Sequence, residues 1–323
     1  MQTRIAIIGG GGVARRHAAV LGGFADVQLV GVTDVVAAAG TALAHEAATV
    51  AFDSLGEMLD ATDPDAVYVC VPPFAHGEAE WALVQRGIPF FVEKPLAAEP
   101  AVAEALAQAV AERGLLTATG YHWRYMANTE RARQLLAGTP ARLAVGAWLD
   151  KVPPVAWWTR RDRSGGQVVE QATHLLDLML DLVGDVDQVY AIASHAPREA
   201  LPDADIDDVT SATLRFAGGA VGSLTATSLL RAKHRAGLEL FCDGRRLELT
   251  ETALVVEDGQ VLKTPEDPWV AKRRVDRAFV DAVQGHGDDV RAAYGVALRT
   301  HRVACAIARS ALDGTPVDLA GAS

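Results

Sequence analysis

The chain contains few cysteines, and none of them forms a recognisable metal-binding or disulfide pattern. Only Cys70, Cys242 and Cys305 occur among 323 residues, and no C-x-x-C pair is present. An odd number of widely separated cysteines argues against a disulfide framework and against a structural zinc site. We therefore assign no metal ligands and expect a reducing, cytoplasmic location.

Basic runs and long apolar runs are also missing. The formal net charge is −11 and no long run of lysine or arginine occurs, which excludes an obvious nucleic-acid or anionic-membrane partner. The most apolar helix candidate, residues 175–184, is interrupted by Asp177 and Asp181, so it should not span a bilayer. The chain opens on a strand-like run rather than on a charged segment followed by an apolar one, so we expect no signal peptide.

The composition that is present, 50% hydrophobic and 22% charged, is typical of a globular protein of two domains. Up to about residue 121, short apolar runs alternate with segments of helical periodicity. This alternation predicts a parallel sheet covered by helices on both faces. The predicted strands are 4–9, 27–34, 66–72, 89–95 and 115–121, and the predicted helices are 13–24, 38–48, 76–87 and 99–114.

The pattern changes after residue 122. A helix is predicted over 168–183, between strand-like runs, and two more helices over about 268–285 and 290–311. Turn signals containing glycine at 217–219, 243–244 and 258–259 separate strand-like runs and predict hairpins. We expect a C-terminal α+β domain over residues 122–323, with a large, mostly antiparallel open sheet and a helix on one face. The strand-like runs are 209–228, 237–251 and 253–263.

A glycine-rich turn follows the first strand directly. Gly9, Gly11 and Ala14 fit G-x-G-x-x-G/A, in which glycines let the backbone approach a pyrophosphate at the start of a helix. The second predicted strand ends at Asp34, placed to accept hydrogen bonds from ribose hydroxyls. A glycine-rich loop without a ligand, and Asp34 as an N-cap, are the alternatives. In this βαβ context we predict a Rossmann-type, doubly wound dinucleotide-binding domain over residues 1–121.

Asp34 also bears on the choice of dinucleotide. Its carboxylate would repel the 2′-phosphate of NADP, and residues 35–40 contain no arginine to hold that phosphate. NAD is therefore the expected cofactor and NADP is less favoured. The predicted cofactor-binding residues are Gly9, Gly11, Gly12, Val13, Ala14, Asp34, Val71, Pro72, His76, Glu93 and Lys94.

The segment "IPFFVEKPLA", residues 88–97, ends an apolar strand in charges. Ligands of open parallel sheets bind beyond the carboxyl ends of the strands. Glu93 and Lys94 should therefore leave the core at the edge where a nicotinamide would lie. Pro95 restricts the backbone of Lys94, and the bond between them is a candidate cis peptide. The alternative is a surface Glu-Lys pair beside a proline that starts a helix.

The stretches "GGGGVARRH", "VCVPPFAH" and "VEKPLA" resemble the glucose-fructose oxidoreductase / inositol dehydrogenase / rhizopine catabolism (Gfo/Idh/MocA) family, and the resemblance covers essentially the whole chain. It implies a Rossmann-type oxidoreductase acting on a sugar or cyclitol. It also implies that Lys94 lies by the reacting hydroxyl and the nicotinamide. A homodimer or homotetramer formed through the C-terminal sheet is implied as well.

A second informative stretch, "SGGQVVEQATHLLDL", spans residues 164–178. Gly165, Gly166, His174 and Asp177 match the family pattern, but Glu170 stands where the family usually has a catalytic aspartate. If the stretch is an α-helix, Glu170 and His174 share one face. Otherwise His174 is a packed histidine.

In "GYHWRYM", residues 120–126, Arg124 is the best candidate to bind substrate, because a guanidinium can bind hydroxyls or a carboxylate. The substrate-binding candidates are Lys94, His122, Arg124, Tyr125, Trp158, Glu170 and His174.

These residues suggest a mechanism. An alcohol releases hydride only if its proton also leaves, so His174 would act as the general base, with Lys94 stabilising the oxygen and Glu170 orienting the imidazole. A reductase of keto-sugars shares every one of these features. A glycosidase or lyase that retains NAD and oxidises its substrate transiently is also compatible with them, as is a non-catalytic dinucleotide-binding regulator.

Overall fold

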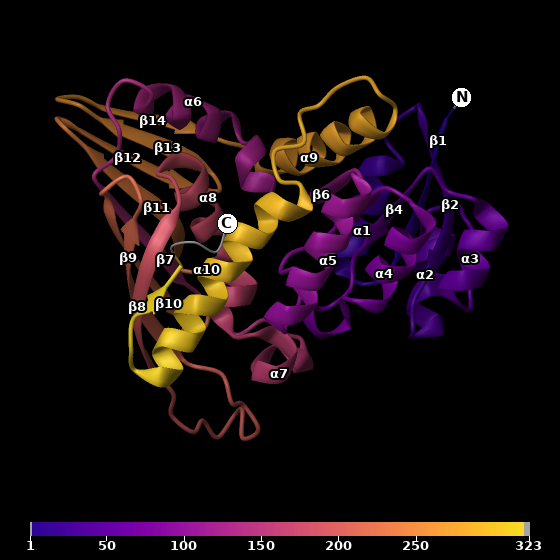
Figure 1. The fold of residues 1–323 in the computed structure, drawn as a ribbon, viewed down its shortest axis with the longest axis horizontal. Coiled ribbons are helices and arrows are strands. Elements are labelled where there is room, and N and C mark those ends of the chain that lie inside the picture. Colours follow the sequence, from indigo (N-terminus) through magenta and orange to yellow (C-terminus); the bar gives the residue numbers. More distant parts are fainter. Residues whose placement is uncertain (1, 320–323) are drawn as a thin grey trace. The chain divides into compact units, whose positions relative to one another are not determined.

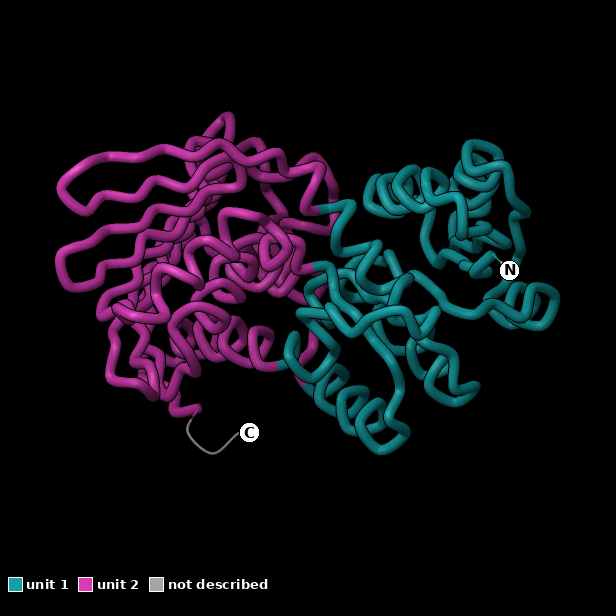
Figure 2. Tube along the Cα trace, turned by 90° about the horizontal axis from the view of Figure 1, so that it is seen from above, with its two compact units in different colours: residues 1–97, 101–120, 272–298 teal, residues 98–100, 121–271, 299–323 magenta. Residues whose placement is uncertain are grey.

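The computed structural model describes residues 2–319, which form two compact units (Figure 2). Unit 1 comprises Met1–Ala97, Ala101–Gly120 and Lys272–Leu298. Unit 2 comprises Ala98–Pro100, Tyr121–Ala271 and Arg299–Ser323. Each unit has its own sheet, and each is described separately below.

Unit 1 is built on a six-stranded sheet in the order β3-β2-β1-β4-β5-β6, with all neighbouring strands parallel. Figure 1 labels β1, β2, β4 and β6 of this sheet. This is the strand order of a doubly wound dinucleotide-binding fold, with the order reversing between β1 and β4. The predicted fold class of the N-terminal part is therefore confirmed. The strands are β1 (Thr3–Ile8), β2 (Val27–Thr33), β3 (Ala51–Phe52), β4 (Ala66–Val69), β5 (Phe90–Val92) and β6 (Thr117–Thr119).

The helices of unit 1 follow the strands in alternation. Two elements between residues 51 and 62, β3 and α3, were absent from the prediction. β3 has only two residues, but α3 carries a start signal, since Ser54 accepts a hydrogen bond from the backbone of Glu57 at 3.2 Å. The helices are α1 (Gly12–Leu21), α2 (Ala37–Glu46), α3 (Leu55–Thr62), η1 (Pro73–Ala75), α4 (Glu78–Arg86) and α5 (Pro100–Arg113).

The chain returns to unit 1 near its C-terminal end. Residues from Lys272 in α9 (Pro268–Val283) to Leu298 in α10 (Tyr294–Asp313) belong to this unit. The division of the sequence at residue 121 had assigned this segment to the second domain. Side-chain contacts explain its place in unit 1, because Asp276 bonds His17 at 2.7 Å and Arg277 pairs with Asp26 at 2.9 Å.

Unit 2 contains a nine-stranded sheet in the order β14-β13-β12-β11-β7-β10-β9-β8-β15. Among the described strands of this sheet, only β7 and β10 run parallel to each other, and the other neighbours are antiparallel. The open, mostly antiparallel sheet and its glycine-containing hairpins were predicted. The strands are β7 (Leu143–Leu149), β8 (Val186–Ser194), β9 (Val209–Phe216), β10 (Val221–Thr227), β11 (Arg235–Cys242), β12 (Arg245–Thr250), β13 (Ala253–Glu257), β14 (Val261–Pro265) and β15 (Val317–Asp318).

One face of this sheet is covered by α8 (Thr173–Leu182). A Cβ atom on Gly146 of β7 would lie 2.7 Å from the Cε atom of Met179 and 3.7 Å from a methyl group of Leu175, so the glycine lets α8 pack closely on the strand. The helix predicted over 168–183 is present, but its first part is the π-helical segment η4 (Val168–Ala172). The other helices are η2 (His122–Tyr125), α6 (Ala127–Leu136), η3 (Ala156–Thr159) and α7 (Arg161–Ser164).

Candidate functional site

The glycine turn between β1 and α1 has the shape that a pyrophosphate requires. Gly9 has φ of +102°, and a Cβ atom there would lie 2.3 Å from the carbonyl oxygen of Cys70. Cβ atoms on Gly11 and Gly12 would meet open space, and no side chain caps the start of α1. Backbone N–H groups at an uncapped helix start bind anions. The residues present at this turn therefore fit a dinucleotide.

Asp34 links the end of β2 to this turn. Its Oδ2 accepts a hydrogen bond from the backbone of Gly10 at 2.6 Å, and its Oδ1 accepts one from the backbone of Val36 at 2.7 Å. Val36, not Asp34, occupies the N-cap position of α2. Each carboxylate oxygen has a second lone pair, so Asp34 can also accept hydrogen bonds from ribose hydroxyls.

His76 follows β4 and has a fixed orientation. Its Nδ1 lies 2.5 Å from Oε1 of Glu80, and Oε2 of Glu80 accepts a hydrogen bond from the backbone of Gly77 at 2.8 Å. Burial alone would raise the pKa of Glu80, but the charge and hydrogen bonds of His76 and Gly77 lower it. His76 is thus held by α4, the helix that follows it, while Val71 and Pro72 lie before it beyond the end of β4.

Glu93 and Lys94 differ in burial, whereas the prediction placed both side chains at the ligand-binding edge. Glu93 is buried, and its carboxylate binds Nε2 of His17 at 2.9 Å and Nη2 of Arg16 at 3.0 Å. The expectation that both charges leave the core at the ligand edge is therefore corrected for Glu93, which is held by α1. Lys94 is partly exposed, and the Lys94–Pro95 peptide bond is cis, as the sequence suggested.

His17 is not among the predicted site residues, yet both of its ring nitrogens contact carboxylates in unit 1. A spacing of 76 residues to Glu93 and 259 residues to Asp276 gives no local signal. Its place in the run "GGGGVARRH" on α1, next to the glycine turn, was the one available indication.

In unit 2, His174 lies near the start of α8 among aromatic rings. Its ring centroid is 5.2 Å from that of His122 and 5.9 Å from that of Tyr121, both nearly edge-on. It stacks at 6.2 Å on Trp123 and at 6.0 Å on Trp148. The imidazole is buried to 8% exposure. These rings restrict the orientation of the imidazole, as a general base requires.

Glu170 lies in η4 and His174 in α8, so the single α-helix expected to carry both side chains is replaced by a π-helical turn followed by an α-helix. A π-helix closes its turns with i→i+5 hydrogen bonds. Gly165 and Gly166 precede this segment with φ of +72° and +88°, and a Cβ atom on Gly165 would lie 2.8 Å from the side chain of Val169. The Gly-Gly pair therefore provides the backbone that leads into η4.

Trp158 supports Glu170 from inside unit 2. Its ring is fully buried, and Nε1 donates a hydrogen bond to Oε2 of Glu170 at 2.7 Å. The ring of this predicted substrate-binding residue is thus packed in the interior. Trp158 contributes instead by holding a carboxylate, and buried tryptophan N–H groups generally find such a partner.

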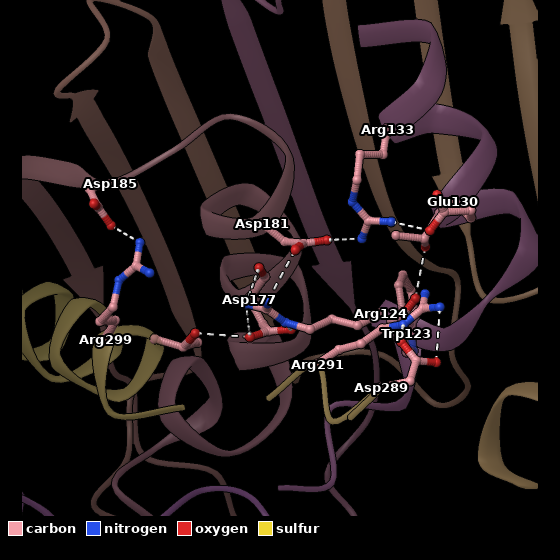
Figure 3. Close-up of polar contacts among 12 residues, drawn as sticks. Trp123, Arg124, Glu130, Arg133, Asp177, Asp181, Asp185, Asp289, Arg291 and Arg299 are labelled. Atoms are coloured by element: carbon pink, nitrogen blue, oxygen red, sulfur yellow. Dashed lines mark hydrogen bonds and ion pairs between the residues drawn. The ribbon is translucent and has the colours of Figure 1, made fainter. Parts of the chain in front are cut away.

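Arg124 binds α8, contrary to the expectation that its guanidinium is presented to substrate. Nε and Nη2 bond the two carboxylate oxygens of buried Asp177 at 2.7 and 2.9 Å, and Nη1 bonds Asp181 at 3.0 Å (Figure 3). Thr300 donates to the same Asp177 at 3.0 Å, and Arg133 bonds Asp181 at 2.7 Å. A bidentate pair with a buried carboxylate is a structural contact, so Arg124 fixes η2 against α8. The neighbouring Tyr125 is buried as well.

His122, by contrast, contacts His174 and a charged pair of unit 2. Besides its contact with His174, its Nε2 lies 3.5 Å from Oε1 of Glu251, and Lys233 Nζ lies 3.4 Å from the other oxygen of that carboxylate. Lys233 Nζ also lies 4.9 Å from the centre of the Trp148 ring. Glu251 and Lys233 were not among the predicted residues, because they lie in connections between strands and carry no motif.

Two models of one family match this chain. Residues 3–121 match the model described as "Oxidoreductase family, NAD-binding Rossmann fold", and residues 132–248 match the "GFO/IDH/MocA C-terminal domain". Together the two matches span more than half of the chain. The chain belongs to the Gfo/Idh/MocA family. The N-terminal match identifies NAD as the cofactor of this Gfo/Idh/MocA protein.

Individual relatives are distant. A Schizosaccharomyces pombe protein is 27% identical over 266 residues, which are 70% of this chain and 64% of the relative, and the alignment with a second protein of that yeast covers 56% of it. The chain thus spans about three fifths of these relatives. Levoglucosan dehydrogenase of Pseudarthrobacter phenanthrenivorans is 27% identical over 260 residues, 69% of this chain and 67% of that enzyme.

The fold of this Gfo/Idh/MocA protein is also seen in solved structures. A levoglucosan dehydrogenase in complex with NADH and levoglucosan superposes with a TM-score of 0.88 at 19% identity, covering 99% of this chain and 100% of that chain.

Within residues 2–319, no group of three or more His, Cys, Asp or Glu side chains is arranged to hold a metal ion. No helix in the same part of the chain combines the length and apolar character needed to cross a membrane.

Proposed function

We propose that this protein transfers hydride between NAD and a carbinol or keto carbon of a sugar, cyclitol or sugar derivative. The observation that carries the proposal is the glycine turn, where Gly11 and Gly12 face open space at an uncapped helix start beside Asp34. Membership of an oxidoreductase family supports the redox chemistry. The activity named for the levoglucosan dehydrogenase relative supports the substrate class.

The catalytic residues of this proposal are Lys94, His174 and Glu170. NAD, when bound, supplies the acceptor for the hydride that leaves the carbinol carbon. His174 takes the hydroxyl proton while the C–O bond becomes a carbonyl, and its aromatic surroundings hold the ring in place. Lys94 donates a hydrogen bond to the same oxygen and stabilises its developing charge. Glu170, held by Trp158, provides a fixed acceptor for a substrate hydroxyl.

NAD is proposed over NADP because Asp34 directly follows β2 and the next residues, Val35 and Val36, are exposed and uncharged. A cytoplasmic location is proposed because the three cysteines, all within the described residues, are thiols rather than disulfides.

A homodimer or homotetramer through the sheet of unit 2 is also part of the proposal. Strand register places Tyr190, Thr213, Ser223 and Val145 in one row across β8, β9, β10 and β7. This row lies on the face opposite α8, where Ile192 is 63% exposed. An exposed sheet face with apolar side chains is suited to burial between subunits. Sedimentation of the purified protein tests this part.

The activity is tested by incubating the protein with NAD or NADP and a panel containing myo-inositol, levoglucosan, hexoses, pentoses and their keto forms. We expect NADH formation with at least one polyol or sugar, and loss of at least 100-fold in kcat for Lys94→Met and for His174→Ala. The affinity for NADH should stay within threefold in both variants. Product formation without release of NADH would indicate the NAD-retaining reaction instead. NADH binding without turnover of any compound would overturn the proposal in favour of a regulator.

A further inference from the structure

The His17 cluster consists of His17, Glu93, Asp276 and Arg16 of unit 1, and its two carboxylates bind opposite sides of one ring. Nδ1 of His17 lies 2.7 Å from Oδ1 of Asp276, and Nε2 lies 2.9 Å from Oε1 of Glu93. Ionised carboxylates only accept hydrogen bonds, and a neutral imidazole has one N–H. Both contacts are therefore satisfied together only when His17 is an imidazolium.

Aromatic packing prevents this ring from turning. The His17 ring centroid lies 5.2 Å from that of Tyr68 and 5.0 Å from that of Phe91. Tyr68 and Phe91 stack on each other at 4.7 Å, and Phe279 meets both edge-on. His17 is 1% exposed, so water does not replace either carboxylate. The ring has one orientation, which bridges α1, β5 and α9.

Glu93 is fixed on its other sides as well. A Cβ atom on Gly120 would lie 2.5 Å from both carboxylate oxygens, so the carboxylate fills the space that a side chain at residue 120 would occupy. Oε2 of Glu93 accepts a hydrogen bond from the backbone N–H of Lys94 at 3.3 Å. The carboxylate thus connects the His17 ring to the backbone of the proposed catalytic lysine.

We propose that His17 is a positioning residue for Lys94: its imidazolium fixes the Glu93 carboxylate, which in turn holds the backbone that carries the lysine. The inference rests on the proposed role of Lys94. It adds a link between α1, whose start is the glycine turn, and the catalytic side chain. In this scheme His17 contacts neither the hydroxyl oxygen nor the carbinol carbon of the substrate.

Charge in the cluster agrees with this geometry. Burial alone would lower the pKa of His17, but attraction to Asp276 and Glu93 and their hydrogen bonds raise it to about 9. Besides the members of the cluster, the ionisable groups beside it are Lys94, which follows Glu93, Tyr68 and Cys70 from the β4 side, and Arg277 from α9. Burial raises the pKa of Tyr68 and of Cys70 well above their usual ranges, so neither competes as an anion near neutral pH.

The first test needs no substrate. The chain has five lysines, so the ε-carbon NMR signals of a ¹³C-lysine-labelled sample can be resolved, and Lys94→Arg assigns one of them. We expect His17→Gln to move the Lys94 signal and to leave the other four unchanged. Met58→Ala removes a fully buried side chain of α3 outside the cluster, and it should leave all five signals in place. A Lys94 signal that is unchanged in His17→Gln overturns the inference.

The second test measures coupling through Glu93 with the substrate that gives the highest rate in the panel. His17→Gln should lower kcat by 10- to 100-fold while NADH affinity stays within threefold. In a Glu93→Gln background, replacing His17 should cause no further loss, because the route to Lys94 is already broken. Additive losses overturn the inference. If Lys94→Met itself retains activity, the proposed function fails instead, so the two failures are distinguishable.

A third measurement covers the case in which His17→Gln does not fold. In the wild-type protein labelled with ¹⁵N-histidine, one imidazole should remain doubly protonated at pH 8, and its signals should shift in Glu93→Gln. The absence of an imidazolium signal at pH 8, or a signal that is indifferent to Glu93→Gln, overturns the inference.

Discussion

The indole nitrogen of Trp158 donates a hydrogen bond to Oε2 of Glu170 at 2.7 Å, and it does so from a fully buried ring. Glu170 itself is half-buried in the π-helical segment η4. The direction of this carboxylate is thus set by a side chain 12 residues earlier, in η3. A glutamate in place of the family's usual aspartate is longer by one methylene, and a rigid donor compensates for the extra freedom.

Trp158→Phe should therefore lower kcat by about tenfold, because a catalytic group that loses its support is misplaced. Stability should fall by only about 1 kcal/mol, since water can replace the donor at half-buried Glu170. The effect on kcat should vanish in a Glu170→Ala background. Steady-state kinetics and thermal unfolding check this, with Trp269→Phe on α9, where the ring is exposed, as the control. Equal kcat for Trp158→Phe and wild type would contradict the role.

A second prediction concerns Arg124, whose guanidinium binds Asp177 on α8. Arg124→Met leaves a buried carboxylate without its cation, which should cost about 3–5 kcal/mol of unfolding free energy. The matched control is Arg133→Met, whose half-exposed pair with Asp181 should be worth less than about 1 kcal/mol. Urea unfolding measures both. A large rise in KM with unchanged stability in Arg124→Met would restore the substrate-binding role expected from the sequence.

The contrast between Arg124 and His174 shows which features of the site can be predicted from the sequence and which cannot. Strand-helix alternation, the glycine turn and the hairpin glycines are local patterns, and the two sheets follow from them. A side chain's partner is a tertiary property. Nothing near Arg124 in the sequence marks Asp177, 53 residues away, as the acceptor for its guanidinium. His174 was found because its helix carries a family motif.

The same limit applies to Glu93 and Lys94, the two charged residues that follow β5. The sequence indicates that Glu93 and Lys94 follow an apolar strand at the ligand-binding edge. It does not indicate that Glu93 is retained inside by His17, since that ring comes from α1 and its second partner comes from α9. The π-helical turn at η4 was equally hidden, because its residues have ordinary α-helical periodicity.

Asp34 gives a third prediction. Asp34→Ser removes the acceptor that bonds the backbone of Gly10 and would meet the ribose hydroxyls. NADH affinity should fall by about 10- to 100-fold, as expected for the loss of one or two charged hydrogen bonds. NADPH affinity should change little or improve, because the charge that repels its 2′-phosphate is gone. Fluorescence titration with both nucleotides checks this, with exposed Asp53→Ser beyond β3 as the control. An unchanged ratio of the two affinities would contradict Asp34 as the discriminating residue.

The pH dependence of stability gives the last prediction. The pKa of His17 is about 9 in the folded protein against an ordinary value of 6.5, so its contribution is complete below pH 6.5 and is lost as pH rises through 9. Burial alone would raise the pKa of Glu93, but His17, Arg16 and Lys94 lower it from 4.5 to about 2. The contribution of Glu93 is therefore complete above pH 4.5 and is lost as pH falls through 2.

These two contributions belong to one coupled pair and together predict a stability plateau between about pH 4.5 and 6.5. From pH 6.5 to 9 the unfolding free energy should fall by about 3 kcal/mol, since each unit of pKa difference corresponds to about 1.4 kcal/mol. Urea unfolding across this range measures the slope. His17→Gln should be less stable at pH 6 and should lose most of the alkaline slope, whereas Met58→Ala should lose stability and keep the slope. A slope that survives in His17→Gln would assign the titration to another group and exclude a charged His17.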